Sequence, residues 1–535
     1  MYRSLCVTHN VSLIDGATSH FCQSCEIVTK PRPKNLFLID LASSRPKQRI
    51  IWKIVMRWNL SYLLLCRSPA IRNLVAFGEV ASHKSLVRAF MSSSRSSSIT
   101  DIQEDHPMKR CHLNHAGASP SPSSVTDRVC RHLELEQIQG GYTAAAMVEK
   151  EVNQVYQAVA DLIHAVPSEI ALVESATVAW TRAFYTFAEH QEREMKGEKN
   201  PVILISDVEY AANVVAACQW ARDKKWTVLS IPSVAVEGKS TGIVDLVALE
   251  EILSGRYVYA NDEGDAILLD PSRIAIACIT HVPTNSGIVN PVVEIGDRIA
   301  EFNARQQQQI LYLVDACQSV GQLVVNAHEI QCHALVATGR KYLRGPRGTG
   351  FLFVSSSIVN QMIPSHIDHY GVLVSDVPDV YQDGDVVQNC LEFAPREGAA
   401  RFEFWESNVA NRLGLGVAIT EATRKGTFTI EKNCTRLAKS LRAQLEGIPS
   451  IVIHHKSSSS CGIVTFYSNT LGSSRIKEKM LTEGFELSVV PATSTPLDSS
   501  KLKVPDLVRA SLSYTNTEDE VVAFSRALRN VLEKI

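Results

Sequence analysis

An aspartate and a lysine stand at the ends of two neighbouring apolar runs in the middle of this chain. The run 310–314 ends at Asp315, and the run 334–337 leads through a Gly-containing turn to Lys341. Short apolar runs bounded by Gly and polar residues are typical of buried strands, and ligands bind beyond the carboxyl ends of such strands. A lysine to form a Schiff base and a carboxylate to keep a pyridine nitrogen protonated are what pyridoxal 5'-phosphate chemistry requires.

Alternating strands and helices are expected to position these two side chains. Further apolar runs lie at 202–206, 226–231, 274–280 and 351–354, separated by helical patterns such as 144–164. This alternation predicts right-handed βαβ units, and therefore an α/β fold with a mostly parallel central sheet flanked by helices. Helical patterns at 409–423 and 430–445 and short strand-like pieces at 451–454 and 462–467 then predict a smaller C-terminal α+β domain.

Three parts follow from these patterns: a leader of residues 1–107, a large cofactor-binding domain of residues 108–420 and a small C-terminal domain of residues 421–535. The leader carries 14 Lys and Arg against 7 Asp and Glu and ends in a Ser-rich tract. Such composition is typical of a disordered extension or an organelle transit segment, and a wrong start is the third interpretation. Its Cys22 and Cys25 are too isolated to predict a zinc site, and we expect no metal.

Composition limits the class of protein. The 535 residues are 45% hydrophobic and 21% charged, with a formal net charge of -2, so we expect neither nucleic acid nor a membrane as a partner. The thirteen cysteines are odd in number and scattered, which favours reduced thiols in an intracellular protein. We expect a cytoplasmic protein, with organelle targeting by the leader as the alternative.

Three motifs in order carry a family resemblance. They are Asp315-Ala-Cys-Gln318, Thr338-Gly-Arg-Lys341 with the following Gly-Pro-Arg-Gly-Thr-Gly, and Val508-Arg509-Ala-Ser-Leu. From about residue 111 to its end, the chain resembles the class V aminotransferase family, the fold type I pyridoxal phosphate enzymes that include the cysteine desulfurases. The resemblance implies a fold type I transferase fold and a homodimer.

The resemblance also implies roles for individual residues around the cofactor ring. Lys341 would bind the cofactor covalently and move protons, and Asp315 would pair with the pyridinium nitrogen. Gln318 would donate a hydrogen bond to the phenolate oxygen, with Thr284 as a second polar partner. Tyr210 stands where many relatives stack a histidine on the ring; tyrosine can stack but has no near-neutral pKa.

Further residues would bind the two anionic groups. The resemblance assigns the cofactor phosphate to Ala176, Thr177, Thr338 and Arg340. Arg509 would bind the substrate α-carboxylate, for which a forked guanidinium is suited. Tyr142 is a further candidate for substrate binding, with core filling as the alternative.

The type of reaction depends on the side chains that surround the cofactor-binding residues. A desulfurase needs a nucleophilic cysteine on a loop before the carboxylate-binding arginine, but the stretch 485–509 holds none, and Cys461 is a poor substitute. The motifs look most like the branch that includes the β-lyase of ergothioneine biosynthesis and the isopenicillin N epimerase-like proteins. The leading hypothesis is cleavage of the C–S bond in a cysteine S-conjugate or its sulfoxide.

Other readings stay open from the sequence. Aminotransfer or epimerisation of an amino acid is the main alternative, followed by persulfide-forming desulfuration and by a cofactor-binding protein without activity. Relatives often supply a phosphate contact across the dimer after Arg401-Phe402-Glu403. In this chain bulky and acidic residues follow, so that contact is in question.

Overall fold

The computed structural model describes residues 110–196, 200–261, 264–376, 392–455 and 461–534, with the backbone of two short leader strands. The chain divides into two compact units, Met1–His106 and Pro107–Ile535. In the first unit, strands β1 (Phe37–Leu41) and β2 (Trp52–Met56) pair antiparallel. The predictions for Cys22 and Cys25 lie outside the described residues.

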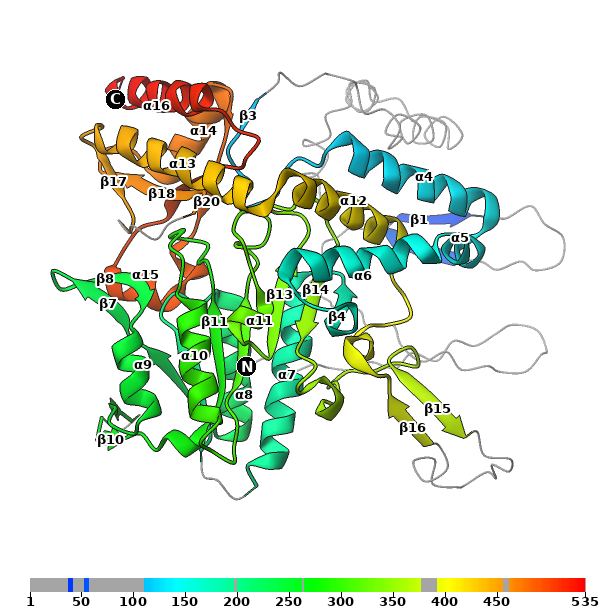
Figure 1. Ribbon diagram of the computed structural model, residues 1–535. Coiled ribbons are helices and arrows are strands. Elements are labelled where there is room, and N and C mark those ends of the chain that lie inside the picture. Colours follow the sequence, from blue (N-terminus) through cyan, green and yellow to red (C-terminus); the bar gives the residue numbers. More distant parts are fainter. Residues whose placement is uncertain are drawn as a thin grey trace. The chain divides into compact units, whose positions relative to one another are not determined.

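A seven-stranded sheet forms the centre of the second unit (Figure 1). Its order is β4-β14-β13-β12-β11-β5-β6, and only β14 runs antiparallel to its neighbours. The predicted α/β class is therefore confirmed. The strands are β4 (Ile170–Val173), β5 (Val202–Ser206), β6 (Thr227–Ile231), β11 (Ile274–Thr280), β12 (Leu311–Asp315), β13 (Ala334–Thr338) and β14 (Gly350–Val354).

Helices cover both faces of this sheet, which explains why its strands read as continuous apolar runs. Every residue of β11, β12 and β13 is buried. Alternate strand residues belong to two separate cores, one on each face. One core includes α6 (Glu149–Ile163), α9 (Leu246–Leu253), α10 (Val292–Asn303) and α12 (Val409–Lys425), and the other includes α7 (Ala176–Glu194) and α8 (Ala211–Lys224).

Residues 144–164, predicted as one helix, are divided in the structure. They form two helices, α5 (Gly141–Met147) and α6, which meet at Val148 with φ -110° and ψ 11°. Because Val148 leaves helical geometry, one continuous helix was the wrong prediction. α6 and α12 then pack together beside α4 (Ser123–Gln139) (Figure 1).

A second sheet organises the C-terminal part. Its order is β17-β18-β21-β20, all antiparallel, with α13, α14 and α16 packed around it (Figure 1). The N-terminal strand β3 (Cys111–His112) pairs with β19 (Phe485–Glu486), and Leu113 enters the same core. The other bounds are α13 (Thr427–Glu446), β17 (Ile451–Ile453), β18 (Ile463–Ser468), α14 (Ser473–Thr482), β20 (Ser488–Val490), α15 (Pro496–Leu502), β21 (Leu507–Ser511) and α16 (Glu518–Glu533).

Smaller elements complete the second unit. Three two-stranded sheets pair β7 (Ser233–Val236) with β8 (Lys239–Val244), β9 (Val258–Ala260) with β10 (Ala266–Leu268), and β15 (Val372–Asp376) with β16 (Glu392–Pro395). A short helix, α11 (Ala327–Ile330), precedes β13.

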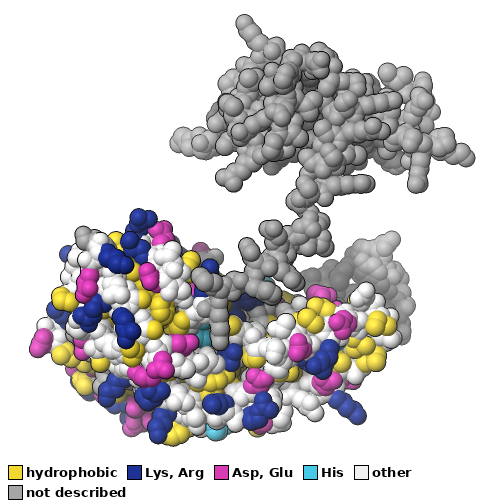
Figure 2. Space-filling model, turned by 90° about the horizontal axis from the view of Figure 1, so that it is seen from above, with side chains coloured by type: hydrophobic (Ala, Val, Ile, Leu, Met, Phe, Trp, Pro, Cys, Tyr) yellow, Lys and Arg dark blue, Asp and Glu magenta, His cyan; other side chains and the backbone are white. Residues whose placement is uncertain are grey.

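Charges of both signs are mixed on the face of the molecule that Figure 2 shows, as the small net charge leads one to expect. Among the described residues, none of the helices combines the length and the apolar character needed to span a bilayer.

Candidate active site

A cavity of about 270 Å³ lies at the carboxyl ends of the parallel strands. Three parts of the chain meet there: the ends of the central strands, the N-terminus of α7, and the C-terminal sheet with the segment that follows β20. Apart from Tyr142, every residue assigned above to the site lines this cavity. The lining includes Ala176, Thr177, Tyr210, Thr284, Asp315, Gln318, Thr338, Arg340, Lys341 and Arg509.

Asp315 ends β12 and is held from two directions. Its Oδ1 accepts the backbone N–H of Cys317 at 2.9 Å, and its Oδ2 accepts from Asn213 Nδ2 at 3.1 Å. The same Asn213 amide also donates to Glu209 Oε1 at 2.8 Å. Asn213 therefore bridges two carboxylates, and neither it nor Glu209 was among the site residues predicted from the sequence.

Glu209 is fully buried beneath the cavity and has an unusual pKa. Burial raises its pKa from 4.5 to about 7, and the nearby Asp315 carboxylate acts in the same direction. Hydrogen bonds from Asn213, Thr280 and Ser206 to its carboxylate oppose that rise. The sequence offered only the position of Glu209 and Asn213 shortly after the apolar run of β5, which does not reveal this burial.

Lys341 follows β13 by three residues and is partly buried in the cavity. Its removal from water lowers its pKa, the Asp315 carboxylate opposes that change, and Arg340 and Arg509 add to it. A lowered pKa favours the neutral amine, the form that attacks a carbonyl or accepts a proton. We use the name cofactor floor for Glu209, Asn213, Asp315 and Lys341.

Gln318 and Thr284 meet above this floor. Gln318 Nε2 donates to Thr284 Oγ1 at 3.3 Å and to the Ala116 carbonyl at 3.1 Å. Its Oε1 is buried without a partner in the described part of the chain. Because buried polar atoms are nearly always hydrogen-bonded, this oxygen marks a place for a ligand donor.

The first turn of α7 provides an anion site. The Ser175 side chain caps this 19-residue helix by accepting from Val178 N, and the first two helical residues, Ala176 and Thr177, line the cavity. Helix N-termini bind phosphate through free backbone N–H groups and the helix dipole. Arg340 adds a guanidinium from the opposite side, where it donates to the Gly117 carbonyl. Thr338 also lines this end, and its hydroxyl donates to Thr349 O at 3.2 Å.

Arg509, on β21, is 5% exposed and has only neutral partners in the described structure. It donates to Ser488 Oγ at 3.1 Å and to the hydroxyl and carbonyl of Thr284. Burial lowers its pKa to about 10, so it stays cationic at neutral pH. A buried cation without an anionic partner is costly, and a substrate carboxylate would neutralise it. We call Val490, Ser494 and Arg509 the substrate wall.

The two tyrosines fall in different places. Tyr210 lines the cavity at the start of α8 and is 42% exposed. Tyr142 is 78% exposed on α5, beside Trp405, with ring centroids 6.1 Å apart. Tyr142 does not line the cavity of its own chain. Because its side chain is largely exposed, the alternative that it fills the core was wrong. Its role in binding substrate stays a prediction.

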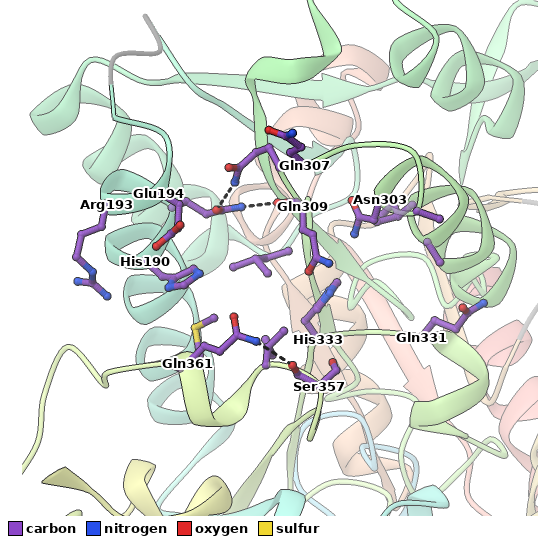
Figure 3. Close-up of a pocket in the computed structure, with 18 of the residues that line it drawn as sticks. His190, Arg193, Glu194, Asn303, Gln307, Gln309, Gln331, His333, Ser357 and Gln361 are labelled. Carbon is purple, nitrogen blue, oxygen red and sulfur yellow. Dashed lines mark hydrogen bonds between the residues drawn. The ribbon is translucent and has the colours of Figure 1, made fainter.

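A larger hollow of about 820 Å³ lies elsewhere, at the amino ends of β12 and β13 (Figure 3). Its polar groups bond to one another: Gln191 donates to the carbonyls of Ala275 and Gln309, and Gln361 donates to that of Ser357. It lacks both the lysine and the anion-binding helix terminus that the 270 Å³ cavity combines. We therefore assign the chemistry to the smaller cavity.

Two cysteines near the site are protonated thiols. Cys461 is fully buried, donates to Gly287 O at 3.2 Å, and has a pKa raised by burial to about 11. Cys317 lines the cavity next to Asp315, and burial together with that carboxylate raises its pKa well above the usual value. Neither environment produces a thiolate.

Together these groups fit pyridoxal phosphate. A phosphate cradle, an amine with a lowered pKa and a fixed carboxylate surround one cavity. Among the described lining residues, two guanidinium groups, Arg340 and Arg509, and the amine of Lys341 face a single carboxylate, Asp315. The excess positive charge suits a phosphate and a carboxylate bound at once.

Comparison with known proteins agrees with this geometry. The profile of the aminotransferase class-V family matches residues 111–261 and 266–524. A probable cysteine desulfurase of Methanothermobacter thermautotrophicus is 25% identical over 440 residues, 81% of this chain and 97% of that protein. A cysteine desulfurase of Yersinia pestis is 26% identical over 428 residues, 78% of this chain and 93% of that protein.

Solved structures share the fold. A cysteine desulfurase from Thermococcus onnurineus NA1 superposes with a TM-score of 0.65 at 18% identity, covering 80% of this chain and 95% of that one. The cystine C–S lyase C-DES, in complex with cysteine persulfide, gives 0.63 at 19% identity, covering 79% and 98%. The chain belongs to the aminotransferase class-V family, the fold type I pyridoxal phosphate enzymes that its motifs indicated.

Proposed function

We propose that this enzyme cleaves the C–S bond of a cysteine S-conjugate or its sulfoxide by β-elimination. One observation carries the proposal: in the described part of the chain, the substrate side of the cavity offers hydroxyl groups and a guanidinium but no thiolate. The stretch 485–509 has no cysteine, and both neighbouring thiols have raised pKa values. β-Elimination needs no thiol that accepts sulfur, whereas desulfuration does.

In this proposal the protein's own residues bind the substrate and move a proton. Arg509 holds the α-carboxylate, and the lowered pKa of Lys341 lets its Nζ take the Cα proton. Asp315, fixed by Asn213 and Cys317 N, holds a proton on the pyridine nitrogen. Bound pyridoxal phosphate supplies the electron sink that stabilises negative charge at Cα.

The overall reaction balances without an oxidant or reductant. The Cβ–S bond breaks with its electron pair on sulfur, and sulfur takes a proton. One water is consumed, and one thiol, one pyruvate and one ammonium ion are released. A sulfoxide substrate would release a sulfenic acid in place of the thiol.

The test is product stoichiometry. Full-length holoenzyme is incubated with cysteine S-conjugates and their sulfoxides, and pyruvate, ammonium, alanine and thiol are measured. We expect pyruvate and ammonium in equal amounts, and none with Lys341→Ala. Amino transfer without pyruvate, or racemised substrate alone, would support the aminotransferase or epimerase alternative and overturn the lyase.

Desulfuration of cysteine is the second candidate, because two curated relatives carry that name. It predicts alanine and enzyme-bound sulfane sulfur from free cysteine. Cys317→Ala and Cys461→Ser separate the possible sulfur acceptors. Equal amounts of alanine and bound sulfur, lost in one of these variants, would replace the lyase assignment.

We further propose a homodimer in the cytoplasm. The neighbouring aromatic side chains of Tyr142 and Trp405 are 78% and 51% exposed, and such exposed aromatics are typical of interfaces. Phe404 packs under the Arg182 guanidinium, and Glu403 pairs with Arg412 at 2.9 Å, so the residues after Arg401 serve the chain's own fold. Sedimentation of wild type and Trp405→Ala tests the dimer, and a wild-type monomer would contradict it.

A further inference from the structure

Two consecutive histidines and an aspartate form a buried cluster outside the cavity. His454 and His455 directly follow β17, and Asp498 lies on α15. The distance from Asp498 Oδ2 to His455 Nε2 is 3.1 Å, and that to His454 Nε2 is 3.7 Å. The three side chains are only 4%, 2% and 1% exposed.

The backbone brings both imidazoles to the same side. Successive residues of a strand point to opposite faces, so adjacent histidines would normally diverge. His455 instead has φ +48°, in the left-handed region, and the two ring centroids lie 4.0 Å apart. A non-glycine residue in that conformation is uncommon and often marks a functional constraint.

Two polar atoms of the cluster have no hydrogen-bond partner among the residues that the structure describes. They are His454 Nε2 and Asp498 Oδ1, both buried. Histidine and carboxylate atoms that are buried and unpartnered are costly, and a cation bound between the imidazoles and Asp498 Oδ2 would pair with His454 Nε2. A simple His–Asp pair would need only one of the two histidines.

The geometry matches a small divalent ion. Ligand atoms bonded at about 2.0–2.1 Å to a tetrahedral ion lie about 3.3 Å from one another. The two nitrogen–oxygen distances to Asp498 Oδ2, 3.1 and 3.7 Å, fall on either side of that value. All possible ligand atoms lie within 4.8 Å of one another, so a small inward shift of the imidazoles would complete the three contacts. Two imidazoles with one carboxylate suit Zn²⁺ and similar transition ions, whereas Mg²⁺ and Ca²⁺ prefer oxygen ligands.

We propose that His454, His455 and Asp498 bind one divalent ion of the zinc class. The ion would join the end of β17 to α15. Asp498 lies four residues after Ser494 of the substrate wall, and its backbone N–H donates to Asp207 O at 3.1 Å. Lys501 on the same helix pairs with Asp207 at 2.6 Å. The ion therefore anchors the segment that forms the substrate wall, whichever reaction the cavity catalyses.

Cobalt serves as the probe. Chelator-treated, full-length holoenzyme is titrated with Co²⁺ and read by its visible difference spectrum, and bound Zn²⁺ is counted by elemental analysis. We expect one ion per chain with nitrogen and oxygen ligands and no thiolate charge-transfer band. Asp498→Asn and His454→Gln should each weaken binding by more than about 100-fold. Mutation of residues that only hydrogen-bond to metal ligands already lowers metal affinity about 10- to 100-fold.

Matched controls separate this site from others. His328→Gln alters a histidine–carboxylate pair with a single histidine, 2.9 Å from Glu169, and should bind as wild type does. Cys22→Ser removes a leader thiol and should also leave binding unchanged. Added Zn²⁺ should raise the melting temperature of wild type but not of Asp498→Asn. Absence of binding at millimolar Co²⁺, or equal affinity in wild type and both cluster variants, would overturn the proposal.

Discussion

The cofactor floor and the substrate wall are built in different ways. Asp315, Lys341 and Glu209 stand at or shortly after the ends of strands in the central sheet, and Asn213 follows on α8. The polar contacts of Asp315 and Glu209 come from residues beside this sheet. The wall comes from β20, β21 and the segment between them, in the C-terminal part. A floor fixed by the sheet can serve many reactions, while the wall decides which bond breaks.

Charge differs between the two regions as well. The floor pairs a carboxylate with an amine, and a second carboxyl lies beneath them with a pKa of about 7. The wall holds an unneutralised guanidinium and hydroxyl groups. We therefore expect floor variants to lose the chemical step and wall variants to lose mainly substrate affinity.

The largest effect is expected at Lys341. Lys341→Ala removes both the covalent attachment and the base, so pyruvate formation should fall at least about 10⁴-fold. The lysine-linked absorbance that borohydride removes should also vanish, which a spectrum before and after reduction measures. Lys479→Ala, an exposed lysine on α14, is the control and should keep full activity. A reducible lysine-linked band that survives in Lys341→Ala would refute the floor assignment.

Arg509→Lys tests the wall. Lysine keeps the charge but loses the fork, and one charge-assisted hydrogen bond is worth about 1.5–3 kcal/mol, so kcat/KM should fall roughly 10- to 150-fold. Steady-state kinetics should show most of that loss in KM. Arg340→Lys is the matched control, because it should weaken cofactor binding and leave the KM for substrate unchanged. A pure kcat loss in Arg509→Lys would remove the distinction between wall and floor.

The sequence predicted the floor better than the wall for a physical reason. Asp315 and Lys341 end or follow apolar runs that are easy to recognise because both faces of the sheet are buried. Six of the seven central strands coincide with the apolar runs predicted above. Glu209 and Asn213 were not predicted, because their importance depends on burial beneath Asp315, and a pattern in the sequence does not reveal that burial. Tyr142 was placed by analogy, and its surface position follows from the separate packing of α5.

Long-range pairing explains the other gaps. Nothing local to Cys111 indicates that β3 pairs with β19, far along the chain, or that Leu113 joins the C-terminal core. Nothing local to His454 and His455 indicates that their side chains converge, because that convergence depends on one positive φ angle. Contacts between distant segments and single backbone angles are decided by packing.

Glu209 gives a pH test of the floor. Its folded pKa of about 7 exceeds 4.5, so the folded state binds more protons between these values and stability falls as pH rises. The loss approaches about 3 kcal/mol, because one pKa unit corresponds to about 1.4 kcal/mol. Glu209→Gln should have a lower free energy of unfolding than wild type at pH 5. Its free energy of unfolding should depend less steeply on pH from 5 to 8. Denaturant melts measure this, and Glu329→Gln, on the surface, should keep the wild-type slope. Parallel slopes in Glu209→Gln and wild type would mean that Glu209 is ionised throughout.

The smallest effect is expected at Cys461, behind the wall. Its thiol is buried, donates to Gly287 O and has a raised pKa, so Cys461→Ser should leave the rate of sulfur release within about twofold of wild type. Its stability should fall by only about 1–2 kcal/mol, because a hydroxyl replaces a buried thiol. Cys434→Ser is the matched control, since that thiol is also buried, on α13, and its pKa is raised to about 12. Equal, small changes in both variants are expected from thiols that only fill space. If Cys461→Ser alone abolished sulfur release while remaining folded, a residue behind the wall would take part in the reaction, and the wall would then carry chemistry that we assign to the floor.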